Sequence, residues 1–250
     1  MSTLILLCAG SSLRYAYGIK QFEVLAGIRV LFWPLYSFIE TGLFDTVCIT
    51  LPSHIMHCAN ISFEEHDITF HLIRGGEKRA DSVANAISFL NSTSSAKVLV
   101  HDSARPFIST KIIRAVNDLL NTYDVVDVVM PISDTIKRIE GGNIDLIDRN
   151  HMFSTQTPQG FLSTMLAKAY MRPGYDQFTD DISYFIKSGI EIGIIYGEAL
   201  NFKITYESDL EMARAIAESK ITEMKNSSTW YALQQIMNKV EKLINIMPAC

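Results

Sequence analysis

The chain has 250 residues, of which 48% are hydrophobic and 20% are charged. A chain of this length and composition buries a sizeable core without disulfides, which excludes intrinsic disorder as its main state. The formal net charge of −5 argues against a broad nucleic-acid-binding surface. No apolar run approaches the ~20 residues of a membrane span. The four cysteines form no CxxC pair, and their spacing suggests neither a zinc site nor a disulfide framework. No basic region precedes the first apolar stretch, so we expect no secretory signal. We therefore expect a cytoplasmic protein with reduced thiols and no membrane partner.

Short apolar runs alternate with helical patterns through the first half of the chain. We expect strands at 3–8, 45–51, 68–73, 97–101 and 125–131, and helices at 31–42, 82–90 and 110–120. Strands that alternate with helices in this way predict βαβ units and a mostly parallel sheet, so the fold class is α/β.

The alternation is interrupted between 132 and 159. Two short strand-like runs, 135–139 and 143–147, flank Gly141 and Gly142, which predicts a β-arm over 132–147 that stands off the sheet. Beyond the arm we expect helices at 162–171, 179–189 and 208–216, and strands at 190–196 and 202–205. Ser208 and Glu211 have the spacing of a capping box at the start of the last of these helices.

The C-terminal residues have a different composition from the rest. We divide the chain into a main domain, 1–218, and a tail, 219–250, in which a polar linker at 220–229 precedes an amphipathic helix. The helix has an apolar seam with intervals of four and three residues, made of Leu233, Met237, Val240, Ile244 and Met247. Such a seam is typical of a short coiled coil and equally of a terminal helix packed on its own domain, and the sequence leaves both open.

Polar clusters follow three of the predicted strands, and in an open α/β sheet ligands bind where strands end. The first cluster, 9–20, has small residues that allow backbone N–H groups to approach phosphates, with Arg14 and Lys20 as fixed positive charges. The second, 75–82, begins with paired glycines. In the third, Asp102 is placed to touch a metal or a sugar hydroxyl, and Arg105 to touch a phosphate. Each cluster alone is also consistent with a solvated turn, but three at one sheet edge favour a binding site.

Taken together and in order, these segments resemble the 2-C-methyl-D-erythritol 4-phosphate cytidylyltransferases of non-mevalonate isoprenoid synthesis. The resemblance runs from about Leu4 to Ile216. The matching segments are Ala9-Gly10 with Arg14, Lys20-Gln21, Gly75-Gly76 with Arg79 and Ser82, His101-Asp102 with Ala104-Arg105-Pro106, Asp134-Thr135 with Lys137, Asp148-Arg149, Thr157-Pro158-Gln159, Thr179-Asp180 and Lys203.

The resemblance implies a Rossmann-like nucleotidyltransferase domain, a homodimer formed through the arm 132–147, and Mg²⁺ that accompanies CTP. It assigns nucleotide binding to Ala9, Gly10, Ser11, Ser12, Gly75, Gly76, Glu77, Arg79 and Ser82. It assigns the sugar-phosphate site to Asp102, Arg105, Thr135, Arg149, Thr157 and Lys203. Arg14 and Lys20 would stabilise charge on the α-phosphate, and Arg149 and Lys203 would hold the attacking phosphate.

The implied reaction converts CTP and 2-C-methyl-D-erythritol 4-phosphate to CDP-methylerythritol and pyrophosphate. The residue types suit it, because an anionic phosphate oxygen attacks without a general base, and catalysis is positioning and charge neutralisation. Ser12 stands where the family usually has glycine, and Ile19 where it usually has proline. Two alternatives stay open: a ribitol-5-phosphate cytidylyltransferase serving a surface polysaccharide, and a nucleotide-binding homologue without turnover.

Overall fold

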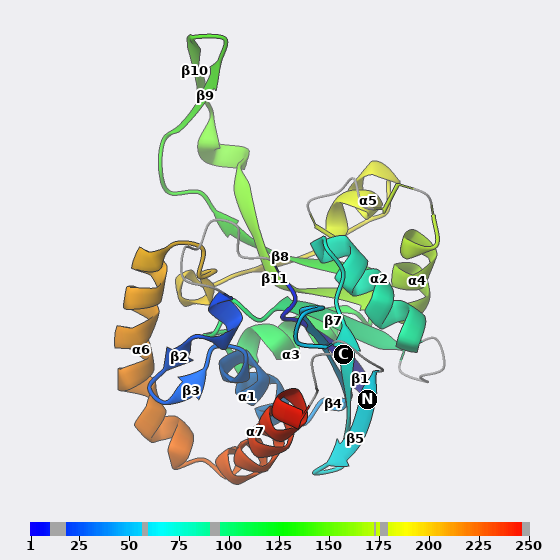
Figure 1. Ribbon diagram of the computed structural model, residues 1–250. Coiled ribbons are helices and arrows are strands. Elements are labelled where there is room, and N and C mark those ends of the chain that lie inside the picture. The colour runs from blue at the N-terminus through cyan, green and yellow to red at the C-terminus, as the bar shows by residue number, and fades with distance from the viewer. Residues whose placement is uncertain (11–18, 57–59, 91–95, 173, 176–179, 247–250) are drawn as a thin grey trace.

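The computed structural model describes residues 1–10, 19–56, 60–90, 96–172, 174–175 and 180–246. In this part of the chain one sheet contains eight strands, in the order β12-β8-β11-β7-β1-β4-β6-β5 (Figure 1). Their bounds are β1 Ser2–Leu7, β4 Phe44–Leu51, β5 Ile61–Glu65, β6 Ile68–Arg74, β7 Lys97–Asp102, β8 Val125–Pro131, β11 Phe153–Leu162 and β12 Gly193–Tyr196. Parallel pairs join β1 to both β4 and β7, β4 to β6, and β8 to β12, which confirms the mostly parallel α/β fold.

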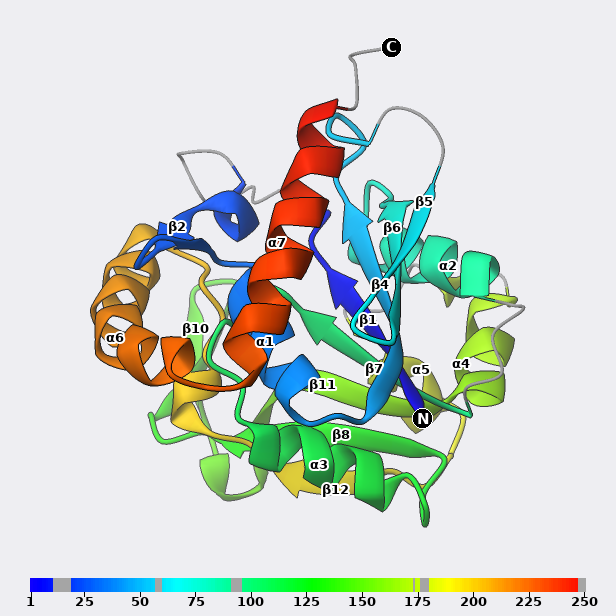
Figure 2. The same ribbon diagram turned by 90° about the horizontal axis from the view of Figure 1, so that it is seen from below.

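Helices cover both faces of the sheet (Figures 1 and 2). They are α1 Phe32–Glu40, α2 Arg79–Leu90, α3 Thr110–Leu119, α4 Ser163–Tyr170, α5 Ile182–Lys187, α6 Glu207–Lys225 and α7 Thr229–Ile246. Strand β1 alternates between the two cores, because successive side chains of a strand point to opposite faces. Leu4 and Leu6 pack in the core beneath α1 and α3, whereas Ile5 and Leu7 pack in the core beneath α2 and α4. None of the described helices is long and apolar enough to cross a membrane.

Strand β11 lies antiparallel between β7 and β8, and the sequence did not indicate it. Its buried positions hold Gln156, Thr157 and Gln159, so it lacks the apolar pattern of a buried strand. These polar side chains are buried with partners: Gln159 donates to Asp127 of β8 at 3.3 Å, and Gln156 donates to a backbone carbonyl at 3.1 Å. Buried polar groups require such partners, and these come from segments far away in the sequence.

Several predicted element boundaries are wrong. The segment 202–205 is extended but joins no strand ladder, although Ile204 donates its backbone N–H to the carbonyl of Ala104 at 2.9 Å. The strand predicted at 190–196 begins only at Gly193. Helix α6 begins at Glu207 and is capped by Asp209, whose carboxylate accepts two backbone N–H groups. The predicted capping box of Ser208 and Glu211 is therefore wrong.

The predicted arm is a hairpin of β9 Ile136–Glu140 and β10 Asn143–Ile147 that projects from the body (Figure 1). Gly141 and Gly142 both have positive φ, +56° and +84°, as a tight two-residue hairpin turn requires. The strand register places three exposed apolar side chains on one face of the arm: Ile139, Ile144 and Leu146. The other face carries an exposed ion pair between Arg138 and Asp145. The arm is thus amphipathic.

The predicted linker at 220–229 is wrong in its first half, because α6 continues to Lys225 and the chain turns at 226–228. Helix α7 then lies across α1 (Figure 2). Leu233, Ile236 and Val240 are fully buried in the same core as α1. Of the two alternatives for the seam, the structure shows packing on the chain's own domain; Met247 lies outside the described residues.

We expect replacement of Ile236 by alanine to lower the free energy of unfolding by about 2–5 kcal/mol, because it leaves a cavity between α7 and the main domain. Urea denaturation followed by circular dichroism measures this change. Lys242→Ala, at an exposed position of the same helix, is the matched control. Equal stability of the two variants would show that α7 does not contribute to the core.

Candidate functional site

A buried carboxylate, Asp102, marks the carboxyl end of β7 and is 8% exposed. Its Oδ2 accepts a hydrogen bond from Lys203 Nζ at 2.6 Å, and its Oδ1 accepts one from Arg79 Nε at 3.1 Å. Burial raises the pKa of Asp102, but the charges of Lys203 and Arg79 outweigh this and hold that pKa well below its ordinary value. Two predicted substrate residues and one predicted nucleotide residue are thereby brought into direct contact.

Arg79 connects this carboxylate to a second one. Its Nη1 donates to Asp181 Oδ2 at 2.7 Å, and Asp181 also accepts a hydrogen bond from the Tyr170 hydroxyl. Burial lowers the pKa of Arg79, yet Asp181 and Asp102 together raise it above the ordinary value. Arg79, the first residue of α2, thus bridges Asp102 at the end of β7 and Asp181 at the start of α5. Neither Tyr170 nor Asp181 is among the site residues predicted from the sequence.

A chain of hydrogen bonds behind Asp102 fixes the state of His101. The backbone N–H of Asp102 donates to Thr157 Oγ1 at 3.0 Å. The same Thr157 oxygen lies 3.1 Å from His101 Nδ1. On the other side of the ring, His101 Nε2 lies 3.2 Å from the carbonyl oxygen of Arg105. These contacts are all satisfied when the imidazole is neutral, with Nε2 as donor and Nδ1 as acceptor. Burial lowers the pKa of His101 to about 4, consistent with that state.

Arg105 is held by backbone carbonyls rather than by a carboxylate. Its Nη1 donates to the carbonyl of Asn201 at 2.9 Å, and its Nη2 lies 3.4 Å from the carbonyl of Thr155. Asn201 is fully buried, and its amide donates to Gln156 Oε1 and to the carbonyl of Thr157. Asn201 therefore holds the Arg105 side chain through its backbone carbonyl and holds β11 through its side-chain amide. Sequence reasoning missed it, because an asparagine in a polar loop carries no distinguishing signal.

The glycine-rich loop after β6 lies against the loop after β1. A Cβ atom on Gly75 would come within 2.1 Å of the Ala9 Cβ, so this contact requires glycine. Gly76 donates its backbone N–H to Ser82 Oγ at 3.1 Å. Lys20, in a short 3-10 helix, is 8% exposed. The structure thus brings the two predicted nucleotide loops together at one edge of the sheet.

Other predicted site residues are not brought together, or are not described. Thr135 and Arg149 are exposed at the base of the arm, where the Arg149 guanidinium donates to the carbonyl of Ser133. Glu77 is exposed at the start of α2. Ser11, Ser12, Arg14 and Thr179 lie outside the described residues.

Within the described ranges, no three His, Cys, Asp or Glu side chains converge to form a metal cage. Asp102 lies at the sheet edge, but cationic side chains already pair with both of its oxygens. These residues therefore do not by themselves form a divalent-cation site.

A mostly parallel sheet with small-residue loops and a Lys–Asp–Arg cluster at the carboxyl ends of its strands defines a class of α/β proteins that bind phosphorylated ligands. The family model described as 2-C-methyl-D-erythritol 4-phosphate cytidylyltransferase (IspD) matches residues 2–219. The chain belongs to that family.

Individual relatives agree with this membership. The protein of that name from Thermotoga neapolitana is 31% identical over 219 residues, which cover 87% of this chain and 97% of the relative. The one from Bacillus cereus is 32% identical over 225 residues, covering 86% and 97%. A crystal structure of the enzyme so named from Thermus thermophilus superposes with a TM-score of 0.70 at 28% identity, covering 87% of this chain and 100% of that one.

The neutral His101 predicts an acid-dependent loss of stability. Its folded-state pKa lies below the ordinary value of 6.5, so as the pH falls from 6.5 toward 4 the unfolded chain takes up a proton that the folded chain does not. This group should therefore cost on the order of 3 kcal/mol of stability between pH 7 and pH 4. Urea denaturation of the wild type and of His101→Gln across this range tests the prediction, and parallel pH profiles of the two proteins would contradict it.

Proposed function

We propose that this chain transfers a cytidylyl group from CTP to 2-C-methyl-D-erythritol 4-phosphate, a step in isoprenoid precursor synthesis. Membership of the family supports the pair of substrates. The observation in this chain that supports the proposal is the cluster of the buried Asp102 with the partly buried Lys203 and Arg79 beside the glycine loop. In this proposal the cluster would offer hydroxyl-accepting and phosphate-binding groups next to a loop whose backbone a nucleotide can approach.

The two glycine-containing loops would hold CTP. Gly75 and Gly76 leave the backbone open to close approach. Ser82, in the first turn of α2, is buried; its hydroxyl accepts the N–H of Gly76 and donates to the carbonyl of Lys78, so it would support the loop around the nucleotide. Lys20 would stabilise negative charge on the α-phosphate, together with Arg14. These assignments follow the resemblance of the sequence to the family.

The sugar phosphate would lie over the end of β7. Asp102 is placed to accept a hydroxyl of the polyol, while Lys203 and Arg105 offer positive charge to its phosphate. In the reaction a phosphate oxygen of the polyol forms a bond to the α-phosphorus of CTP. The bond from that phosphorus to the bridging oxygen breaks, and pyrophosphate leaves with the electron pair. Because the attacking oxygen is already anionic, no proton transfer is needed, and fixed positive charge is the main catalytic contribution.

Mg²⁺ would enter with CTP and be held mainly by the phosphate oxygens, because the described carboxylates form no cage for it. When bound, it would neutralise charge on the triphosphate. Its requirement, like a cytoplasmic location, remains a prediction from the sequence.

The proposal includes a homodimer through the arm. Ile139, Ile144 and Leu146 are 71%, 64% and 74% exposed on one face of the arm, an apolar surface that a second subunit would cover. Thr135 directly precedes β9 and Arg149 follows shortly after β10, so both lie at the base of this arm. In such a dimer they would serve the site of the partner subunit, which reconciles their position with the role that the resemblance assigns to them.

Pyrophosphate release with CTP and Mg²⁺ tests the reaction directly. We expect release with 2-C-methyl-D-erythritol 4-phosphate and little with ribitol 5-phosphate. Release with ribitol 5-phosphate alone would replace the proposed acceptor by the alternative polyol. CTP binding without release from either substrate would identify a nucleotide-binding homologue without turnover.

Lys20 and Lys203 should have separable effects. Loss of one preorganised charge on the transition state costs on the order of 10²–10³ in rate, so Lys20→Ala should lower kcat by that factor. Lys203→Ala should raise the KM for the sugar phosphate and leave the Kd for CTP nearly unchanged by calorimetry. Lys168→Ala, at an exposed position of α4, is the control. Loss of CTP binding in folded Lys203→Ala protein would reverse the assignment.

The arm prediction can be tested without deleting any segment. Ile144→Asp combined with Leu146→Asp puts charge on the apolar face and should convert the dimer to monomers by light scattering at micromolar concentration. Met212→Asp, at an exposed apolar position of α6, should leave the dimer intact. A wild-type chain that is already monomeric at that concentration would refute the arm-mediated dimer.

A further inference from the structure

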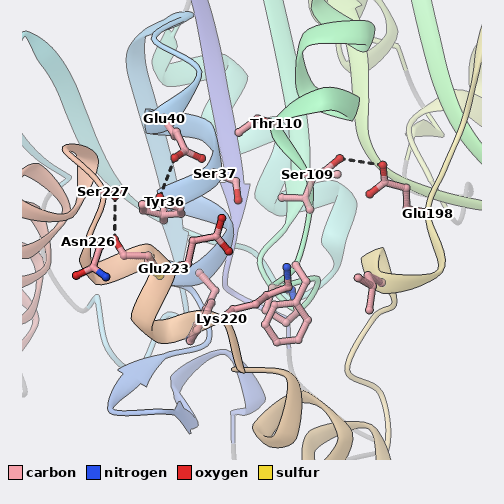
Figure 3. Close-up of a pocket in the computed structure, with 16 residues that line it drawn as sticks. Tyr36, Ser37, Glu40, Ser109, Thr110, Glu198, Lys220, Glu223, Asn226 and Ser227 are labelled. Carbon is pink, nitrogen blue, oxygen red and sulfur yellow. Dashed lines mark hydrogen bonds between the residues drawn. The ribbon is translucent and has the colours of Figure 1, made fainter. Parts of the chain in front are cut away.

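A cavity of about 610 Å³ lies on the side of the molecule where α1 meets the end of α6 (Figure 3). The loop after β7 and the 3-10 helix Ala199–Asn201 complete its walls. This volume is in the usual range for small-molecule sites. Its lining includes none of the described residues assigned above to CTP or to the sugar phosphate.

One wall of this cavity lies outside the segment that matches the family. The family match ends at residue 219, whereas Lys220, Glu223, Met224, Asn226 and Ser227 all line the cavity. They are there because α6 continues to Lys225 and turns sharply into α7. The cavity therefore depends on the C-terminal extension and is not part of the family's catalytic site.

The charges in the cavity are mainly negative. Among the described residues that line it, Glu40, Glu198 and Glu223 outnumber the one cationic side chain, Lys220. Figure 3 shows Tyr36 lying between Glu40 and Glu223. The Tyr36 hydroxyl donates to Glu40 Oε1 at 2.8 Å, and burial, the largest cause, raises its pKa to about 12, so it remains a protonated donor. An anionic ligand would meet an excess of carboxylates, whereas a cation would be attracted.

The remaining walls are aromatic and aliphatic. Trp33, Tyr36 and Phe107 contribute rings, and Trp33 packs edge-on against Phe107 with ring centroids 5.5 Å apart. Aromatic faces attract organic cations through their quadrupole, most strongly where carboxylates are close. Rings and carboxylates in one cavity therefore favour an ammonium group that carries an apolar body over a hydrated metal ion.

We propose that this cavity is a binding site for a small organic cation, whose ammonium group lies near Glu223 and Glu40 and whose apolar body packs against Trp33 and Phe107. The inference does not depend on the catalytic activity. Glu223 is the residue to test, because it is exposed on α6 and its replacement by glutamine removes charge without disturbing the core.

Isothermal titration calorimetry with three probes of similar size tests the site: benzyltrimethylammonium, phenylacetate and benzyl alcohol. We expect the cation to bind most tightly, and Glu223→Gln to weaken it by about tenfold, the loss of one charge contact. Glu218→Gln removes the same charge from the same helix outside the cavity and should leave binding unchanged. Phenylacetate binding as tight as that of the cation, or equal affinities for the two glutamine variants, would overturn the proposal.

Discussion

The site depends on one constraint: a buried carboxylate at the end of β7 must remain paired with cations. Taking a carboxylate out of water costs several kcal/mol, and removing one partner of a buried pair typically costs about 3–5 kcal/mol. Asp102 meets this requirement with Arg79 from α2 and Lys203 from the segment before α6. Two parts of the chain that are distant in sequence are thereby held at the same strand end.

The hydrogen-bonded residues near Asp102 are adjacent in sequence to residues that line the cavity between α1 and α6. Arg105 is held by the carbonyl of Asn201, and the residues adjacent to these two, Pro106 and Leu200, both line the cavity. An occupied cavity would thus contact the same two segments that position the Arg105 guanidinium. The C-terminal extension builds the outer wall of the same cavity, so the cavity lies between this extension and the segments that contain Pro106 and Leu200.

The apolar strands and the glycine loops could be predicted from the sequence because their signals are local. The side chains of β1 alternate between the two cores, and the apolar run that predicts this strand spans only a few residues. The turn of the arm is likewise predicted by the adjacent pair Gly141-Gly142. Lys203 illustrates the opposite case, because the sequence assigns it to the site only through the family resemblance. Its partner Asp102 lies 101 residues away, and a lone lysine in an extended run resembles a solvated edge. Strand β11 was missed because its buried side chains are polar, and Gln156 and Gln159 donate hydrogen bonds to partners that are distant in sequence.

The contact between Gly75 and Ala9 restricts which sequences this fold can adopt as it diverges. Reducing Ala9 to glycine would remove the shortest of the contacts that a Cβ on Gly75 would make. Such a Cβ would still lie 3.0 Å from Ser82 Oγ and 3.1 Å from the Leu51 carbonyl, so these neighbours would have to shift by a few tenths of an ångström. This glycine therefore tolerates a side chain only if several of its neighbours shift together. It would be retained as long as the two loops remain in contact.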